Sequence, residues 1–364
     1  MLTMEIVLAG VALFLAFGNG ANDNFKGFAT VWGSDTLPYR RALLLATLAT
    51  VAGSLASWWL AGTLVEQFSG RGLVPVEVAN APQFIAAVGM GAALTVLAAT
   101  RLGLPISTTH ALIGGLVGAG LGQPDAQVRY VALASLFLLP LLASPLIAAL
   151  LGYAASRLVK RLPADDCACV VAAPALAPPV GAIRVGNGVP AVLIAPESQC
   201  REKSGVVTRL SLARTGDRAH VASAALICFA RGVNDTPKLA ALLIAGSAID
   251  AVGTALAIAV VMAAGGLLYA RRVAVTMSRR VTRMDHGQGM AANLVTATLV
   301  LFASKFGMPV STTHVSVGAI AGMGASAGTI DWATVRNIVL SWAATLPLAA
   351  ALAWLAATLV ILAP

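Results

Sequence analysis

Charged side chains are scarce in this sequence. Aspartate, glutamate, lysine and arginine make up only 11% of its 364 residues, whereas apolar residues make up 58%. Soluble globular domains carry about 25% charged residues. The shortage excludes an ordinary soluble domain and predicts an integral membrane protein that crosses the bilayer several times, with membrane lipid as its surroundings.

Cysteine is also rare, with four in the chain: Cys167, Cys169, Cys200 and Cys228. Three of them lie in a basic segment that we expect in the reducing cytoplasm, so a secreted disulfide framework is excluded. The pair Cys167-x-Cys169 has no histidine nearby, and we expect free thiols there instead of a metal site. The zinc-protease motif H-E-x-x-H does not occur. We expect no cofactor.

Positive charge is more abundant, with a net charge of +9, but its distribution excludes nucleic acid as a partner. The basic residues gather in two segments between apolar runs, 157–218 and 271–283. Lysine and arginine are enriched in the cytoplasmic loops of membrane proteins. We therefore place both segments, together with Arg40 and Arg41, on the cytoplasmic side.

Two groups of apolar runs flank a polar central stretch. The runs are 4–17, 42–65, 84–100, 106–121 and 128–159, then 219–230, 239–246, 248–270, 290–304, 310–324 and 332–362. Several are shorter than the roughly 20 residues that a helix needs to cross the hydrocarbon core. Short spans at matching places in two halves indicate broken helices around a binding site. We predict an all-α integral membrane protein with about 10 to 12 transmembrane segments.

These runs define three parts: a first transmembrane repeat at 1–159, a cytoplasmic linker at 160–217 and a second transmembrane repeat at 218–364. When the spans are threaded through the cytoplasmic segments, corresponding spans run in opposite directions. The two repeats are therefore predicted to have inverted topology, with a site near the middle of the membrane. The path of the short spans stays open, because such a span can re-enter instead of crossing.

The same two motifs occur in both halves. Gly-x-Asn-Asp begins residues 20–27 and 232–239, and Gly-x-Pro-x-Ser-Thr-Thr-His fills residues 103–110 and 307–314. Polar and ionisable residues are costly inside a membrane and usually mark the path of an ion or substrate. Matched polar interruptions in two halves are typical of secondary transporters.

The Ser-Thr-Thr triplets predict an anion site. Gly and Pro end the preceding helix, and Ser is a favourable N-cap for the next one. A helix N-terminus presents free N–H groups and a partial positive charge, and hydroxyls add donors for a tetrahedral oxyanion. A plain N-cap or a bond between helices is the alternative, but two matched copies favour substrate contact. The candidate residues are Ser107, Thr108, Thr109, Ser311, Thr312 and Thr313.

The Asn-Asp pairs are candidates for a cation or proton site. Oxygen atoms of Asn22, Asp23, Asn234 and Asp235 suit Na⁺. An aspartate can instead accept a hydrogen bond from a protonated anion, or pair with a helix terminus or a nearby lysine.

Lys26 and Lys238 each follow an aspartate by three residues. A buried ammonium needs such a partner, and each lysine could replace a bound cation beside the anion. The alternative is that each extends its ammonium to the membrane interface. These two interpretations are evenly balanced.

His110 and His314 directly follow the triplets. They could relay protons, although a polar contact between helices is the interpretation that we favour. An intramembrane enzyme is a further alternative, with Ser107 or Ser311 as nucleophile and the histidine three residues later as base. A duplicated nucleophile has no catalytic logic, since a hydrolase needs one oriented site. We therefore predict a transporter and not an enzyme.

The doubled Gly-x-Asn-Asp and Pro-x-Ser-Thr-Thr-His motifs resemble those of the inorganic phosphate transporter (PiT) family, throughout both halves but not the central linker. The resemblance implies symport of inorganic phosphate with Na⁺ or H⁺, an inverted-repeat fold, a homodimer and, for a bacterial member, a place in the inner cell membrane. It implies anion contact by Asp23, Asp235 and the six triplet residues, and cation ligation by Asn22 and Asn234.

The chain departs from the family's usual Gly-Ala-Asn-Asp-Val-Ala-Asn-Ala pattern. Lys26 and Lys238 stand where the later Asn would be, and Phe25 and Pro237 replace a small residue. The coupling ion, H⁺ or Na⁺, therefore stays open.

A permease for sulfate or another tetrahedral oxyanion is the alternative function. Phosphate can donate a hydrogen bond to an aspartate at neutral pH, whereas sulfate cannot, and an unpaired buried group discriminates strongly. The aspartates therefore favour phosphate, unless both lysines neutralise them. A passive channel is a further alternative.

Overall fold

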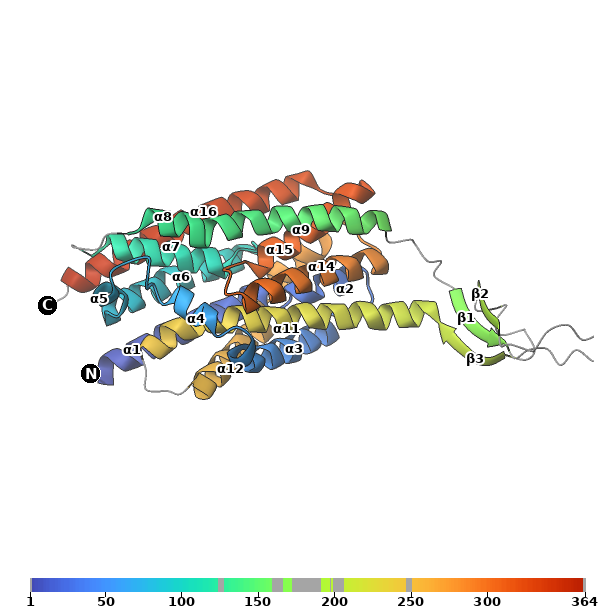
Figure 1. Cartoon of the computed structure of the whole chain (residues 1–364), viewed down its shortest axis with the longest axis horizontal. Coiled ribbons are helices and arrows are strands. Elements are labelled where there is room, and N and C mark those ends of the chain that lie inside the picture. The colour runs from blue at the N-terminus through green and yellow to red at the C-terminus, as the bar shows by residue number, and fades with distance from the viewer. Residues whose placement is uncertain are drawn as a thin grey trace, which may run out of the picture. The chain divides into compact units, whose positions relative to one another are not determined.

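The computed structural model describes residues 2–123, 128–158, 166–171, 191–196, 198, 206–246 and 251–362. The chain divides into two compact units: Met1–Val159 together with Val221–Pro364, and Lys160–His220. The first unit contains both copies of each motif and is helical throughout its main elements (Figure 1). It therefore positions the candidate site.

The first half of this unit begins with α1 (Leu2–Asp23), which ends at the first Asn-Asp pair. The following elements are η1 (Lys26–Phe28, a 3₁₀ turn), α2 (Ala29–Gly33), α3 (Tyr39–Leu60), α4 (Thr63–Phe68), α5 (Val76–Ala79), α6 (Pro82–Leu102), α7 (Thr108–Leu121), α8 (Tyr130–Ala132), η2 (Leu133–Leu138, a π-helical turn) and α9 (Leu139–Leu158). Long apolar segments become helices because a bilayer offers no other partners for backbone groups.

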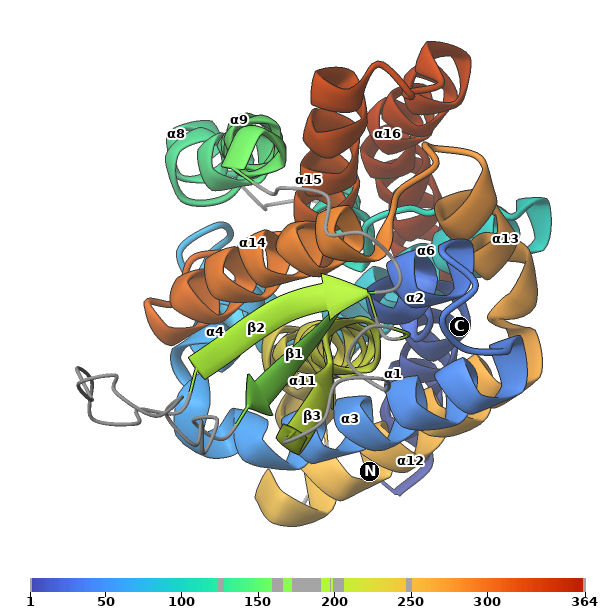
Figure 2. The same cartoon turned by 90° about the vertical axis from the view of Figure 1, so that its right-hand side faces the viewer.

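The second half contains α11 (Leu212–Gly246), α12 (Ala251–Tyr269), α13 (Arg271–Arg279), α14 (His286–Lys305), α15 (Thr312–Ala327) and α16 (Trp332–Leu362). Helices of the two halves pack on each other: α15 on α9, α16 on α6 and α7, and α12 on α1 and α3. Figure 2 shows α15 between α9 and α16. The halves are therefore interleaved and do not form separate bundles.

Seven described helical stretches are long and apolar enough to cross a membrane: Met4–Gly33, Tyr39–Leu60, Pro82–Leu102, Tyr130–Leu158, Val252–Tyr269, His286–Lys305 and Trp332–Leu359. Helix α7 is apolar but shorter. The chain is therefore a multi-pass membrane protein, as its composition predicted. The total of about 10 to 12 segments stays a prediction.

The two Asn-Asp copies differ in their backbone. The first copy lies where α1 ends and the chain turns into η1, in agreement with the predicted broken helix. The predicted break between runs 219–230 and 239–246 is wrong, because α11 continues through the second copy with Pro237 inside it. Membrane helices tolerate an internal proline when neighbouring groups satisfy the freed backbone atoms.

The glycine of each Gly-x-Asn-Asp motif lies at a close helix contact. A Cβ atom on Gly20 of α1 would collide with the carbonyl of Met262 on α12, and one on Gly232 of α11 would collide with the carbonyl of Thr50 on α3. Small residues let membrane helices approach closely. Each motif helix is thus held against a helix of the other half.

The second unit contains a three-stranded antiparallel sheet, which the all-α prediction did not include. In spatial order its strands are β2 (Ala191–Pro196), β1 (Asp166–Val171) and β3 (Val206–Ser211). Valine favours β-strands, but these segments are short and lie within the stretch that was predicted to be a polar linker. Cys167 is not in a disulfide, whereas Cys169 is disulfide-bonded, so the expectation of free thiols is wrong for Cys169. Cys200 lies outside the described residues.

Candidate functional site

The first Asn-Asp copy is tied to the loop between α6 and α7. The Asn22 amide donates to Thr100 Oγ1 at 2.9 Å and to the Leu104 carbonyl at 3.0 Å. Its Oδ1 atom accepts from the Ile106 N–H at 3.2 Å. Because buried polar groups need partners, these bonds fix the loop against the end of α1.

The second copy makes a related set of bonds with the loop between α14 and α15. Ser304 Oγ donates to Asn234 Oδ1 at 3.1 Å, and the Asn234 amide donates to the Val310 carbonyl at 3.4 Å. Thr100 and Ser304 each precede the serine of their own triplet by seven residues. This pair was not among the predicted site residues, although a hydroxyl residue at the same place in two apolar runs was a visible signal.

The Gly-x-Pro-x loops turn each helix into the next one at the site. Gly103 has φ +72° and Gly307 has φ +66°, a left-handed conformation that favours glycine. Ser107 and Ser311 then cap α7 and α15, since each Oγ accepts from the backbone N–H of the histidine three residues later, at 3.1 and 3.2 Å. The N-cap prediction is confirmed, and both helix N-termini present N–H groups at the site.

Buried ionisable side chains surround these loops. The Lys26 ammonium lies 2.5 Å from Asp23 Oδ1. The Lys238 ammonium lies 3.7 Å from Asp235 Oδ1, and Arg231 Nε lies 3.5 Å from Asp235 Oδ2. All five residues are 1–4% exposed, so neither lysine extends to the interface. The structure thus brings three basic and two acidic side chains into one cluster.

Arg231 is the one charged residue of this cluster that was not predicted from the sequence. Its guanidinium donates to Asn19 Oδ1 at 2.7 Å, to Asn24 Oδ1 at 3.2 Å and to Thr50 Oγ1 at 3.3 Å. Arg231 therefore joins α11 to the first half of the chain. The available signal was a lone arginine directly after the apolar run 219–230 and four residues before Asp235, which is the spacing of an ion pair on a helix.

Asn19 is a second residue that was missed. Its amide donates to Thr108 Oγ1 at 3.0 Å and to Asp235 Oδ2 at 3.2 Å. It therefore links the first triplet to the second Asn-Asp copy. Asn19 also stands four residues before Asp23, the position that corresponds to Arg231.

The last threonine of each triplet reaches across to the other half. Thr109 Oγ1 donates to the Val310 carbonyl at 3.3 Å, and Thr313 Oγ1 donates to the Ile106 carbonyl at 2.8 Å. Thr312 is buried in the first turn of α15. The predicted residues of both halves thus meet at one place.

The predicted Na⁺ ligands face ammonium groups in this structure. Lys26 donates to Asn22 Oδ1 at 3.0 Å as well as to Asp23, and Lys238 lies beside Asp235. Among the described residues no group of three or more His, Cys, Asp or Glu side chains is placed to hold a metal ion. The oxygen atoms around these ammonium groups come instead from a mixture of carboxylate, amide, hydroxyl and carbonyl groups.

Comparison with known proteins shows which family the chain belongs to. The model of the "Phosphate transporter family" (PHO4) matches residues 19–353. This chain belongs to the phosphate transporter family. It is 27% identical, over 383 residues and 93% of each chain, to a relative named as a phosphate permease from Pyrococcus abyssi. It is also 27% identical to the chloroplastic inorganic phosphate transporter 2-1 of Arabidopsis thaliana, covering 93% of this chain and 69% of that one.

The fold of this phosphate transporter family member is similar to the solved structure of "The sodium-dependent phosphate transporter". The TM-score is 0.76 with 24% identity, and the match covers 100% of both chains. The family is one of transporters and not of enzymes.

The two histidines of this transporter family member contact each other. The ring centroids of His110 and His314 are 4.4 Å apart, and the His314 ring lies 3.9 Å from that of Trp342. His314 Nδ1 is 3.5 Å from the Leu141 carbonyl. The two rings thus pack α7 against α15, whereas the polar contact of His314 is with α9. A role in proton relay stays a prediction.

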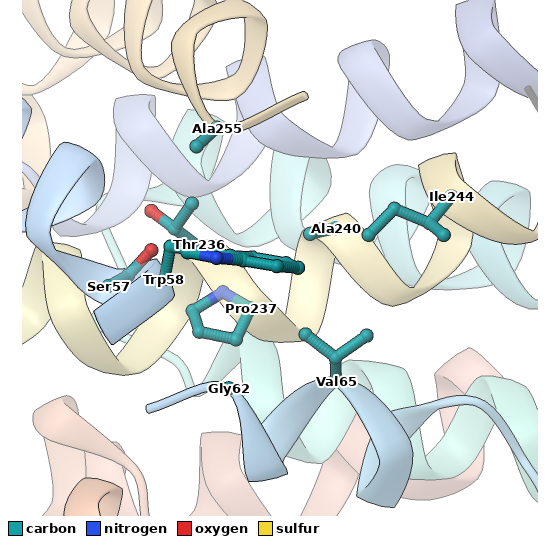
Figure 3. A pocket seen from close by; sticks show the side chains of 9 residues that line it. All are labelled: Ser57, Trp58, Gly62, Val65, Thr236, Pro237, Ala240, Ile244 and Ala255. Carbon is teal, nitrogen blue, oxygen red and sulfur yellow. The ribbon is translucent and has the colours of Figure 1, made fainter. Parts of the chain in front are cut away.

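A small pocket lies on the other side of α11 from the charged cluster. Figure 3 shows Thr236, Pro237, Ala240 and Ile244 of α11 facing Trp58 and neighbouring residues across it. Its described lining residues carry no charge. An oxyanion needs the donors of the opposite face, so we assign the candidate site to the charged cluster and not to this pocket.

Proposed function

We propose that this protein carries out secondary active symport of inorganic phosphate, coupled to H⁺ or Na⁺, by alternating access around the buried cluster. One observation carries the proposal. Three basic and two acidic side chains form one buried cluster, in which Lys26 and Lys238 hydrogen-bond to Thr313 and Thr109 at the N-termini of two helices. The cluster carries one more basic than acidic group, and helix N-termini favour anions.

The substrate is held by the hydroxyls and N–H groups of the two triplets in this proposal, with Asp23 and Asp235 beside it. Monohydrogen or dihydrogen phosphate has both acceptor oxygens and a proton to donate. The acceptors suit the helix N-termini and Arg231, whereas the proton suits a carboxylate. A site that combines donors and carboxylates thus matches phosphate in both respects.

Inverted repeats would give this site access to each side of the membrane in turn. Two features support them. Corresponding contacts recur in both halves, such as Thr109 with Val310 and Thr313 with Ile106. In Figure 1, α7 runs toward the end of the bundle where α8 begins, whereas α15 runs toward the opposite end. We further propose a homodimer and, in a bacterial cell, location in the inner membrane.

Sulfate is the second candidate substrate, and one observation favours it. Each aspartate of the site is paired with a basic side chain, at 2.5 Å for Asp23 and at 3.5 and 3.7 Å for Asp235. A neutralised carboxylate repels a fully ionised anion less. Such a site would tolerate sulfate as well as phosphate.

Uptake by proteoliposomes tests both candidates. Radiolabelled phosphate should accumulate when a pH or Na⁺ gradient is imposed, with the two gradients varied separately. Excess unlabelled sulfate at fixed ionic strength should leave phosphate uptake intact; strong competition would favour the sulfate permease. Counterflow distinguishes a carrier from a pore, because only a carrier is stimulated by substrate on the opposite side. Absence of phosphate accumulation under every gradient would contradict the proposal.

A further inference from the structure

The side chain of Lys26 ends in a shell of four oxygen atoms. Its ammonium donates to Asp23 Oδ1 at 2.5 Å, to the Ile106 carbonyl at 2.8 Å, to Asn22 Oδ1 at 3.0 Å and to the hydroxyl of Thr313. An ammonium has three N–H donors, so four close oxygens exceed what it can use. Carboxylate, amide, carbonyl and hydroxyl oxygens around one charge are the surroundings that proteins build for hard cations.

Lys238 occupies the corresponding shell of the second half. Its ammonium donates to Thr109 Oγ1 and to the Val310 carbonyl, both at 2.8 Å, and lies 3.7 Å from Asp235 Oδ1. The two shells follow one rule. Each combines the aspartate of its own repeat, the carbonyl that precedes its own triplet and the last hydroxyl of the other triplet. Such a match is difficult to explain by chance burial of two lysines.

We propose that the two ammonium groups are tethered cations, which fill the places where an exchangeable Na⁺ would bind, so that transport by this chain does not require Na⁺. This inference rests on the proposed function and assigns its coupling. Both lysines are almost fully buried, with exposures of 3% and 1%, so each ammonium is fixed within its shell. A free cation entering the same shell would meet a positive charge at close range.

A covalent attachment changes the energetics of coupling. A dissociable cation is released with the substrate, so that its concentration gradient helps to drive transport. A lysine balances the charge of the anion in every state of the transporter and is never released. The Na⁺ gradient then has no means of driving uptake. The proton remains as the coupling ion, because phosphate itself and the buried carboxylates can carry it.

Removal of one ammonium tests the idea by binding alone. Lys26→Ala leaves the oxygen shell intact and opens space for a cation. Lys26→Met is the matched control, because it removes the charge but fills the same volume with apolar atoms. Thermal unfolding of the purified full chain is measured without phosphate, in sodium chloride or choline chloride at equal ionic strength.

We expect sodium to raise the Tm of Lys26→Ala by about 2–4 °C relative to choline, which is the shift given by a ligand present well above its Kd. Wild type and Lys26→Met should show no difference between the two salts. Lys238→Ala, with Lys238→Met as its control, repeats the test in the second shell. This pair of variants replaces the first pair if Lys26→Ala does not fold. The proposal would be overturned if sodium raised the Tm of wild type as much as that of the alanine variants. It would also be overturned if sodium raised the Tm of neither folded alanine variant.

Uptake of phosphate by wild type gives a separate measurement. Replacement of sodium by choline on both sides, at a fixed pH gradient, should change the initial rate less than twofold. A requirement for Na⁺ would overturn the tethered-cation proposal but leave phosphate transport standing. Absence of uptake under any gradient would contradict the proposed function, while the unfolding measurement would still decide whether the shells bind Na⁺.

Discussion

The two Asn-Asp copies carry one motif on differently built backbones. In the first copy α1 ends at Asp23 and the chain turns through η1, whereas α11 continues through the second copy. Nevertheless, the lysine three residues after each aspartate reaches the same kind of oxygen shell. The comparison shows that motif spacing and the two Gly-x-Pro-x loops, and not helix continuity, determine where the ammonium lies.

Charge is the second difference between the copies. The residue four positions before the aspartate is Asn19 in the first copy and Arg231 in the second, and the two side chains contact each other at 2.7 Å. The first copy therefore has one basic and one acidic group, whereas the second has two basic groups and one acidic group. The second copy thus supplies the surplus positive charge of the site.

The largest effect is expected from removing a carboxylate. Asp23→Asn leaves Lys26 without its ion-pair partner, and Asp235→Asn leaves both Arg231 and Lys238 without theirs. Loss of one partner of a buried pair costs roughly 3–5 kcal/mol. We expect uptake to be abolished in both variants and the Tm to fall further in Asp235→Asn. Radiolabelled uptake and thermal unfolding check this, with membrane insertion as the control; normal transport in either variant would refute the assigned role.

Replacing Arg231 would remove the charge difference between the copies. Arg231→Asn makes the two positions alike, and we expect the KM for phosphate to rise about 10–100-fold, because a hydrogen bond to a charged group contributes roughly 1.5–3 kcal/mol. Arg231→Lys keeps the charge but not the branched contacts with Asn19 and Asn24. Partial recovery in the lysine variant would assign the effect to charge. An unchanged KM in Arg231→Asn would remove Arg231 from the site.

The two loop glycines allow a finer comparison. Alanine in the left-handed conformation costs about 1–2 kcal/mol. A Cβ atom on Gly307 would also lie 2.9 Å from Thr63 Oγ1, whereas on Gly103 the nearest atom is the Arg272 carbonyl at 3.4 Å. We therefore expect Gly307→Ala to lower the Tm more than Gly103→Ala. Asparagine, which tolerates this conformation better, is the control at each position. Equal losses of Tm in the two alanine variants would indicate that backbone strain, and not the contact with Thr63, determines the effect.

The smallest effect on stability is expected from the helix caps. Loss of a serine cap costs about 1 kcal/mol. Because the cap bonds of Ser107 and Ser311 are nearly equal, at 3.1 and 3.2 Å, the two alanine variants should lower the Tm equally. Serine→threonine at either position should retain most of the stability. A loss confined to one copy would indicate that the two half-helices are not equivalent.

Much of this molecule could be predicted from its sequence. Apolar runs located the membrane helices, and Gly-x-Pro before Ser107 and Ser311 located two helix starts, because these signals are local in the chain. The duplicated spacing also identified Asp23, Lys26, Asp235 and Lys238 as site candidates. Local sequence signals were sufficient for prediction wherever a single stretch of the chain determines its own conformation.

The remaining features depend on distant contacts. The continuity of α11 at Pro237 depends on neighbouring helices, since proline alone predicts a break. Arg231 and Asn19 were missed because their partners lie in the other half of the chain, and neither belongs to a repeated motif. The sheet of β1–β3 depends on pairing between short strands that carry little signal singly. Tertiary partners, and not local propensity, decided each of these cases.

The crossed hydroxyl contacts have a consequence for motion. Lys26 of the first half is bonded to Thr313 of the second, and Lys238 of the second half is bonded to Thr109 of the first. Each of the two ammonium groups therefore connects one half of the chain to the other. Any rocking that parts the halves at this place has to break at least one of these lysine–threonine hydrogen bonds.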